Sequence, residues 1–374
     1  MRVKGIAVFV LAGMAAVLLW AKEVRAVETA LTSSSYHHEE ASWSPDGQWI
    51  TYVRNDASGY RHVWKVQVTG GPETQLTAGT LYRNNPSWAP DDSAIAYERL
   101  DADGYRRIYK VSPSGGAETL ITTDPEHYQG FNPNWSPDSS MLTLWVNKLV
   151  GPAWICTVSA TGGNYNWLIS PSISPIYSHA GDRIAIACPS SPDICSIPSN
   201  GGSVTQITND AYGEYMGELW SFSDSKIVYV KIDSSNFRRI YSVPSNGGSE
   251  TLLTPDNNDY GGPSFSPDDK FILFQKAVGL TNQIYFMRSD GSGQTPITND
   301  SYDNVLPRWS PDGTKVLYLK TDATGYRQIY IFTPMSQLLI PTLSEVGLFA
   351  LFLVLLAALF LTALRRTAPK RAKE

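Results

Sequence analysis

The chain has 374 residues, 30 basic and 35 acidic side chains, and a formal net charge of −5. Both ends are basic: residues 1–26 hold four basic and one acidic residue, and residues 335–374 hold five and two. The body between them therefore carries 21 basic and 32 acidic residues. Such an acidic body argues against nucleic acid or an anionic membrane surface as its partner. With only three cysteines, its stability must come from a packed core.

Residues 1–26 are predicted to be a secretory signal peptide. Arg2 and Lys4 form a charged start, residues 5–21 are apolar, and Val24-Arg25-Ala26 places small residues where a signal peptidase cleaves. Because the apolar run is long, an uncleaved membrane anchor is the alternative. In both cases the body is exported.

A five-residue phrase, Trp43-Ser44-Pro45-Asp46-Gly47, returns throughout the body. Its leading aromatic residues are separated by 42 to 47 residues, a spacing that is typical of repeat architectures. Close copies begin at Trp88, Trp135, Phe265 and Trp309, and two altered copies begin at Tyr177 and Trp220.

Each repeat is predicted to contain four strands. The phrase is a turn, because Pro fixes one turn dihedral, Asp bonds its own backbone and Gly accepts a positive φ. In the second repeat, Ile95-Ala96-Tyr97 follows the turn, and Ile108–Val111 gives a third strand. A Gly pair then precedes a fourth strand that ends in Ile121-Thr122. These runs are too short for helices. Residues 27–334 are therefore predicted to form an all-β, seven-bladed propeller of four-stranded blades.

The seventh repeat lacks a fourth strand of its own. The chain leaves its Ile329-Tyr330 strand directly for the tail, whereas Leu31-Thr32 precedes Trp43 by the 11 residues that separate Thr298 from Trp309. We expect residues 27–32 to complete the last blade, which closes the ring and removes an exposed sheet edge.

The phrase, the Ile-Tyr strand, the Gly pair and the Leu-Thr ending together resemble the propeller repeats of TolB-like proteins. The resemblance covers about residues 31–332 and implies the fold, whereas propellers host many functions. TolB itself carries an additional α/β domain before its propeller, for which this chain has no room. Similar propellers accompany prolyl-peptidase domains, but the chain has no Gly-x-Ser-x-Gly motif.

The tail is predicted to contain a linker at 335–345, a transmembrane helix at 346–364 and a basic cytoplasmic end at 365–374. With its motif Ile340-Pro341-Thr342-Leu343, it resembles the IPTL-CTERM sorting signal of Gram-negative bacteria. The resemblance implies an exosortase-like processing enzyme as a partner, and a location in the periplasm or at the cell surface. Val346 stands where the family usually has Trp. A plain C-terminal anchor is the alternative.

Candidate binding residues lie on one predicted face, which we call the hairpin face. It is built by the loops entering each first strand and by the hairpins that join second to third strands. Tyr and Arg are favoured binding anchors. Alternatively, the Asp of each hairpin pairs with its Arg while Tyr covers the blade edge. The opposite turn face, made of phrase turns and Gly pairs, is expected to offer little side-chain surface. The candidates are Tyr60, Arg61, Tyr105, Arg106, Phe237, Arg238, Tyr326, Arg327, Tyr36, Tyr82, Tyr128 and Tyr302.

His37, His38 and His127 share the hairpin face, where some pectate-fragment lyases with similar repeats bind a metal. No His-x-His or His-x-x-x-His spacing supports such a site, so neither a metal nor another cofactor is predicted. The phrase aspartates are interpreted as turn caps and not as calcium ligands, because each belongs to a different blade.

Cys188 and Cys195 flank a short hairpin and are candidates for a disulfide, whereas Cys156 is expected to be a small core residue.

No Ser/His/Asp set can be nominated, so the chain is predicted to be a non-catalytic binding or scaffold module for an unknown protein or saccharide. Two alternatives stay open. One is a propeller enzyme of the lyase or hydrolase type that acts on saccharides, which a metal near His37, His38 and His127 would favour. The other is a periplasmic Tol-like assembly factor, which copurification with an envelope lipoprotein would support.

Overall fold

The computed structural model describes residues 27–122, 128–148, 151–170, 174–209, 214–215 and 220–333. The predicted signal peptide, linker, sorting motif, transmembrane helix and basic end lie outside the described residues. Within the described ranges, no helix is long and apolar enough to cross a membrane. Residues 28–332 form one compact unit.

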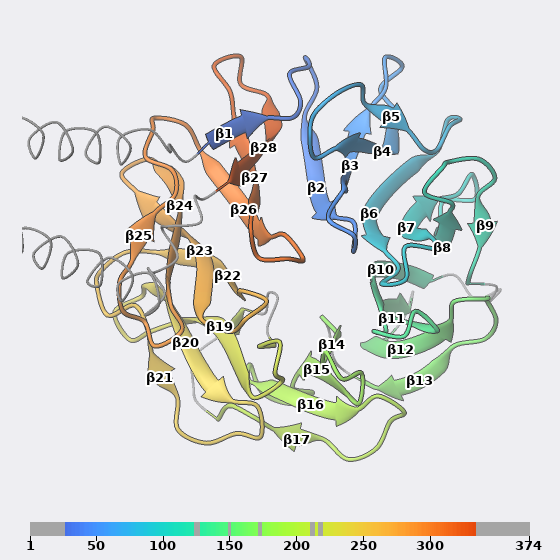
Figure 1. Ribbon diagram of the computed structural model, residues 1–374. Helices are drawn as coiled ribbons and strands as arrows, with labels where there is room; N and C mark the ends of the chain where they lie inside the picture. Colours follow the sequence, from blue (N-terminus) through green and yellow to red (C-terminus); the bar gives the residue numbers. More distant parts are fainter. Residues whose placement is uncertain are drawn as a thin grey trace, which may run out of the picture. The chain divides into compact units, whose positions relative to one another are not determined.

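The described residues of this unit form seven antiparallel four-stranded sheets that follow one another around a ring (Figure 1). This arrangement confirms the predicted all-β propeller. Blade 1 contains β2 (His38–Trp43), β3 (Trp49–Asn55), β4 (Arg61–Gln67) and β5 (Thr74–Gln75). Blade 2 contains β6 (Tyr82–Trp88), β7 (Ile95–Leu100), β8 (Arg106–Val111) and β9 (Thr119–Leu120). Blade 3 contains β10 (Tyr128–Trp135), β11 (Met141–Lys148), β12 (Ala153–Ser159) and β13 (Asn166–Ile169).

The remaining blades follow the same order. Blade 4 contains β14 (Ile176–Tyr177), β15 (Arg183–Ala187), β16 (Ile194–Pro198) and β17 (Thr205–Gln206). Blade 5 contains β18 (Glu214–Tyr215), β19 (Lys226–Ile232), β20 (Arg238–Pro244) and β21 (Thr251–Leu252). Blade 6 contains β22 (Tyr260–Phe265), β23 (Phe271–Val278), β24 (Thr281–Arg288) and β25 (Thr295–Pro296). Blade 7 contains β26 (Asn304–Trp309), β27 (Val316–Thr321), β28 (Arg327–Thr333) and the N-terminal β1 (Val27–Ala30).

The phrase aspartates cap their own turns, as predicted. Asp46 Oδ1 accepts hydrogen bonds from Ser44 Oγ at 2.5 Å and from the Gln48 amide at 2.9 Å. The same pair of bonds recurs at Asp138, Asp268 and Asp312. Because each carboxylate serves the turn that contains it, these residues hold the β-turns between first and second strands.

The last phrase residue links each blade to the preceding one. Where it is Gly47, Gly181 or Gly313, a Cβ would stand only 3.2 to 3.8 Å from a proline of the preceding turn. In three blades it is an aspartate with positive φ, namely Asp92, Asp224 and Asp269. Asp224 accepts the amides of His179 and Ala180, and Asp269 those of Phe222 and Ser223. Ser139 similarly accepts the Asp91 amide. Replacing Gly at this position therefore costs conformational energy, because a non-Gly residue is strained at positive φ. In return, the side chain forms hydrogen bonds between blades.

The hydrophobic core lies between neighbouring blades. Trp88, the leading aromatic of the second phrase, packs in one cluster with Val63 and Leu76 of blade 1. Similar clusters join blades 2 and 3, 3 and 4, 4 and 5, 5 and 6, and 7 and 1. Each sheet thus buries both faces, and the ring must be complete for the core to be complete.

The threonine that follows each fourth strand explains the recurring Leu-Thr and Ile-Thr endings. In blade 2, Thr122 Oγ1 accepts the Ile108 amide at 3.1 Å, at a point where the short β9 no longer pairs with β8. Six blades share this bond, which satisfies a buried backbone donor. The pairs are Thr77 with Val63, Thr122 with Ile108, Thr208 with Ile194, Thr254 with Ile240, Thr298 with Ile284 and Thr32 with Ile329.

The N-terminal strand closes the ring, as predicted. β1 pairs with β28 in the last blade, and the Leu31 amide donates to the Ile329 carbonyl at 2.8 Å. Glu28 accepts Tyr318 Oη at 2.5 Å and Lys320 Nζ at 2.8 Å. The segment therefore makes the same backbone and side-chain contacts as a fourth strand that follows directly in sequence.

Glu28 is one member of a repeated group that we call the clasp. The clasp consists of a carboxylate just before or at the start of the fourth strand, a second-strand cation that pairs with it, and a third-strand ring that lies against that cation. In blade 1, Glu73 pairs with Arg54 at 2.7 Å, and the guanidinium lies 3.8 Å from the Trp64 ring centroid. Blades 2, 5 and 7 repeat it with Glu118, Arg99 and Tyr109, with Glu250, Lys231 and Tyr241, and with Glu28, Lys320 and Tyr330.

The clasp is coupled to pH through its carboxylate. Burial alone would raise the pKa of Glu73, but hydrogen bonds from His38 and Tyr52 and the charge of Arg54 lower it below its usual value. A carboxyl with a lowered pKa stabilises the fold at neutral pH, and this contribution is lost as acid protonates it.

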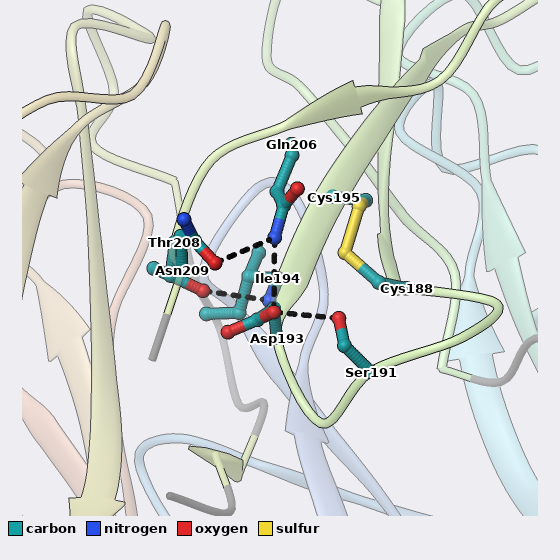
Figure 2. Close-up of a disulfide and its surroundings, with 8 residues drawn as sticks. All are labelled: Cys188, Ser191, Asp193, Ile194, Cys195, Gln206, Thr208 and Asn209. Carbon is teal, nitrogen blue, oxygen red and sulfur yellow. Dashed lines mark hydrogen bonds between the residues drawn. A yellow bond between two sulfur atoms is a disulfide. The ribbon is translucent and has the colours of Figure 1, made fainter. Parts of the chain in front are cut away.

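Blade 4 has a disulfide where other blades have the clasp (Figure 2). Cys195 is opposite Ile186 as Trp64 is opposite Tyr52, and the Cys188 amide bonds the Asp193 carbonyl, which places Cys188 in the register of Arg54. The predicted Cys188–Cys195 bond is thus confirmed, and it joins the two positions that a cation and a ring occupy elsewhere. Cys156 is a buried residue of the hydrophobic core, also as predicted.

Deleting residues 27–32 should destabilise the protein by on the order of 4 kcal/mol, because a ladder, the Thr32 bond and one clasp are lost together. Chemical denaturation measures the loss. Val27→Ala, at an exposed position, is the matched control and should change stability by less than about 0.5 kcal/mol. An unchanged midpoint after the deletion would show that blade 7 closes differently.

Replacing Cys188 and Cys195 together by Ser should cost about 2 kcal/mol, since a short covalent loop is opened where no clasp exists to replace it. Dithiothreitol should lower the melting midpoint of the native chain and leave that of the double variant unchanged. Cys156→Ala, the control, should keep its sensitivity to the reductant. A native midpoint that ignores the reductant would contradict this role for the disulfide.

Candidate functional site

Entering loops and second-to-third hairpins share one face, as predicted, and they bond across blade boundaries. His37 Nδ1 of blade 1 accepts the Arg327 amide of blade 7 at 3.3 Å. Asp259 of blade 6 accepts the Arg238 amide of blade 5 at 2.9 Å, and Asp303 of blade 7 accepts the Asn282 amide of blade 6 at 2.9 Å. The hairpin face is therefore a connected rim and not a set of separate loops.

Several aromatic candidates lie at these same boundaries. The Tyr60 ring of blade 1 makes an edge contact with Tyr82 of blade 2 at 5.7 Å, and Tyr326 of blade 7 makes one with His37 of blade 1 at 5.2 Å. These rings pack across the boundaries between blades. Part of their surface is still open to solvent: Tyr82 is 42% exposed.

Other aromatic candidates contact cations of their own blade. Tyr36 and Tyr302 lie against the clasp cations Arg54 and Lys320, at 5.2 and 5.6 Å. Phe237 lies 5.7 Å from the Arg239 guanidinium, and Tyr105 is half-buried. The backbone of Tyr128 belongs to β10, while its side chain lies outside the described part of the structure.

The expected pairing of hairpin Asp with the following Arg is shifted by one residue. Asp56 bonds His62 at 3.2 Å, and Asp101 bonds Arg107 at 2.8 Å. Asp233 pairs with Arg239 in the same way. The pairing expected with Arg61, Arg106 and Arg238 was wrong because alternate strand residues point to opposite faces of the sheet, and only the second residue after the aromatic faces the Asp.

Arg61 and Arg106 instead face a polar group near the ring axis that the sequence did not indicate. Glu98 is fully buried and accepts Arg106 Nη1 and Asn85 Nδ2, each at 2.8 Å, and the Asn132 amide at 3.0 Å. It thus ties blade 2 to blade 3. These three hydrogen bonds hold the Glu98 carboxylate in one orientation.

Glu40 is the second acid of this axial group. Its carboxylate accepts the Asn85 amide of blade 2 at 2.5 Å, and Arg61 lies 3.2 Å away. Burial raises the pKa of Glu40 despite the bond from Asn85 and the charge of Arg61. A carboxyl with a raised pKa keeps its proton to higher pH. It can donate a hydrogen bond to a polar ligand while it is protonated, and it can accept one from the ligand when it is ionised.

Backbone bulges in the first strands position this axial group. Glu40, Asn85, Asn132 and Leu306 have φ between 50° and 55°, and each lies where the pairing of its first strand shifts register. Figure 1 shows these strands closest to the middle of the ring. A β-bulge changes the direction in which a side chain points from its strand. A non-Gly residue at positive φ also costs conformational energy, so the surrounding structure must hold it there. Sequence patterns do not mark this position, since Glu, Asn and Leu all occupy it.

The two described histidine candidates diverge, as expected of adjacent residues. His38 is buried, and its ring bonds the Arg327 carbonyl at 3.1 Å and Glu73 at 3.2 Å. His37 bonds the Arg327 amide, and His127 lies outside the described residues. In the part of the chain that is described, no three His, Cys, Asp or Glu residues are grouped to hold a metal ion. Both ring nitrogens of His38 are therefore engaged in bonds within the fold.

The turn face is richer in side-chain surface than expected. Cavities of about 390 and 580 Å³ open there among phrase residues. The expectation failed because it considered the turns alone, whereas the leading aromatics and the altered phrases of blades 4 and 5 also reach this face.

Residues 19–172 match the family model described as the TolB beta propeller domain. Over these residues the chain is similar to TolB propeller repeats, and the described residues form a seven-bladed β-propeller. A search of curated proteins finds no match.

Several solved structures share this propeller fold. An oligogalacturonate lyase in complex with manganese has a TM-score of 0.68 at 19% identity, over 83% of this chain and 94% of that one. TolB from Acinetobacter baumannii gives 0.50 at 21%, over 66% and 63%. The propeller domain of the Trilobed protease from Pyrococcus furiosus gives 0.61 at 13%, over 79% and 95%. At these identities the likeness shows the fold alone.

Removing the buried Glu98 carboxylate by Glu98→Ala should destabilise the propeller by about 3 kcal/mol, because the half-buried Arg106 guanidinium, the Asn85 side chain and the Asn132 amide lose their acceptor. Glu39→Ala is the matched control: Glu39 also pairs with an arginine, Arg61, at 2.9 Å but is 38% exposed. It should cost less than about 1 kcal/mol. Equal losses in urea denaturation would show that the axial group does not depend on Glu98.

Proposed function

We propose that the chain is an exported, non-catalytic β-propeller that binds a protein or saccharide ligand, or scaffolds one, in the cell envelope or at the cell surface. The observation that supports this proposal is the arrangement of side chains where blades 7 and 1 meet on the hairpin face. There Tyr326 contacts His37, and among the described residues the Arg327 guanidinium makes no ion pair or hydrogen bond.

An uncommitted guanidinium beside a fixed aromatic ring suits recognition of an acidic or planar group. Arg can bond a carboxylate with two parallel N–H groups, and a Tyr ring can stack on a sugar or pack on a partner. The half-buried position of both side chains limits the conformational entropy that binding would cost.

A paired substitution, Tyr326→Ala with Arg327→Ala, tests this site. Crosslinking in the envelope fraction of the native host should capture at least about tenfold less partner with the pair than with the native chain. Leu120→Ala, an exposed change on the outer strand of blade 2, is the control and should capture normally. Undiminished capture by the pair, with a lowered melting midpoint, would assign both residues to the fold alone.

The tail supports delivery to the envelope. A motif at residues 340–343, an uncharged run at 346–364 and a basic end occur together, as in a sorting signal that a membrane enzyme of the exosortase type would process. TolB itself works in the periplasm, and the propeller match supports the same compartment for this chain. The Cys188–Cys195 bond is of the kind that persists in an oxidising compartment.

Intact mass spectrometry of protein from the native host tests the tail proposal. The mature chain should lack residues 346–374 as well as the signal peptide. Replacing Pro341 and Thr342 by Ala should leave the tail attached, because the motif is altered while the apolar run remains. A native mass that includes residues 346–364 would reduce the tail to a permanent anchor.

A saccharide-acting enzyme is the second candidate, and the axial group is the observation that favours it. Glu39 and Glu40 are adjacent acids beside Arg61, and Glu40 has the raised pKa that suits a general acid. The likeness to an oligogalacturonate lyase supports a search for this activity. Release of unsaturated products from acidic oligosaccharides, abolished by Glu40→Gln, would replace the binding proposal with this one.

A further inference from the structure

The two altered phrases of adjacent blades place aromatic rings where the others place proline. After the second phrase residue, five blades have Pro45, Pro90, Pro137, Pro267 and Pro311. Blade 4 has His179 and blade 5 has Phe222 at this place. Their ring centroids lie 4.3 Å apart at an interplanar angle of 30°, so the rings stack. Phe222 is nevertheless 43% exposed. Two neighbouring departures that meet in one exposed stack indicate a local purpose beyond making turns.

The stacked rings border the cavity of about 390 Å³ on the turn face. Residues of blades 2 to 6 line it, and its walls include the phrase aromatics Trp135, Tyr177, Trp220 and Phe265. No Asp, Glu, Lys or Arg is among the described residues that line it. A concave, mostly apolar site of this volume suits one small neutral ligand, because a charged group would lose its water without gaining a charged partner.

The walls and the rim of the cavity are fixed before any ligand arrives. Trp135 Nε1 donates to the Ser87 carbonyl at 3.0 Å, and Trp220 Nε1 donates to the Ile176 carbonyl at 3.2 Å, which orients both indole rings. Two residues with positive φ hold the rim: Asp224 accepts the His179 amide at 2.8 Å, and Asp269 accepts the Phe222 amide at 2.6 Å.

His179 is further fixed by its ring, since Nδ1 lies 3.3 Å from Asp224 Oδ1. A rigid pocket loses little conformational freedom on binding, which favours affinity for a ligand of matching shape.

We propose that this turn-face cavity binds a neutral, planar aromatic group, which stacks on Phe222 at the rim and enters between the phrase aromatics. Offset and edge-to-face contacts with the surrounding rings would hold such a group. The site is separate from the hairpin-face site, because its residues come from the opposite ends of the first strands. Binding here therefore does not depend on Tyr326 or Arg327.

Titration of the full chain with 5-fluoroindole, followed by fluorine NMR, tests the proposal. Saturable binding is expected, and Phe222→Ala should weaken it by about tenfold, the effect of one aromatic pair. Benzoate, a planar ring with a charge, should bind less tightly than 5-fluoroindole. Leu252→Ala, an exposed apolar change on the outer strand of blade 5, is the control and should leave the affinity unchanged.

A second arm distinguishes a free ring from a peptide side chain. An acetylated and amidated Gly-Trp-Gly peptide that competes with 5-fluoroindole would make a protein segment the natural ligand, whereas no competition would favour a small aromatic compound. The Tyr326→Ala, Arg327→Ala pair should bind 5-fluoroindole normally, which separates this site from the hairpin-face proposal. Absence of saturable binding, or an affinity that Phe222→Ala does not change while the variant melts normally, would overturn the inference.

Discussion

The bond between a threonine hydroxyl and the backbone of the neighbouring strand is the interaction on which the ring depends. The fourth strands are only two to four residues long, too short to hold an outer edge by ladder bonds alone. Thr122 Oγ1 prolongs the pairing by accepting the Ile108 amide, and its equivalents do so in five other blades. In each of these six blades, one hydroxyl thus satisfies a buried backbone donor.

The clasp adds charge to the same edge. Arg54 can lie over the Trp64 ring and still reach Glu73, because Trp64 is opposite Tyr52 and is therefore the diagonal neighbour of Arg54 on one sheet face. In an acidic chain, this arrangement uses cations to secure carboxylates that would otherwise repel one another. Blade 4 has the Cys188–Cys195 disulfide at the two positions that the cation and the ring of the clasp occupy in blades 1, 2, 5 and 7. A covalent bond therefore links the second and third strands of blade 4 at these positions.

Sequence alone predicted the blades, their closure and the disulfide, because each leaves a periodic or countable signal. The phrase repeats at fixed intervals, and Thr32 stands as far before Trp43 as Thr298 stands before Trp309. Such patterns reflect local turn and strand chemistry, which acts in the same way in every blade.

The candidate sites were predicted less well, because they depend on geometry that spacing does not encode. Arg106 was expected to meet Asp101, but strand alternation turns it toward Glu98. The bulge at Asn85 leaves no sequence signal, and neither does the contact between His179 and Phe222, which lie 43 residues apart. In each case the decisive partner belongs to another strand or another blade. The recurrence of a cation two residues after a second-strand Tyr, as in Tyr52 and Arg54, was a signal that could have located the clasp.

Hydrogen exchange at the Ile329 amide tests the central claim most directly. This amide donates to Thr32 Oγ1 at 2.9 Å, as the Ile284 amide donates to Thr298 Oγ1 at 2.9 Å in blade 6, where the fourth strand follows in sequence. If the N-terminal strand closes the ring, both amides should be protected to within about tenfold of each other. Exchange of Ile329 at the rate of an open sheet edge, with Ile284 still protected, would contradict the account.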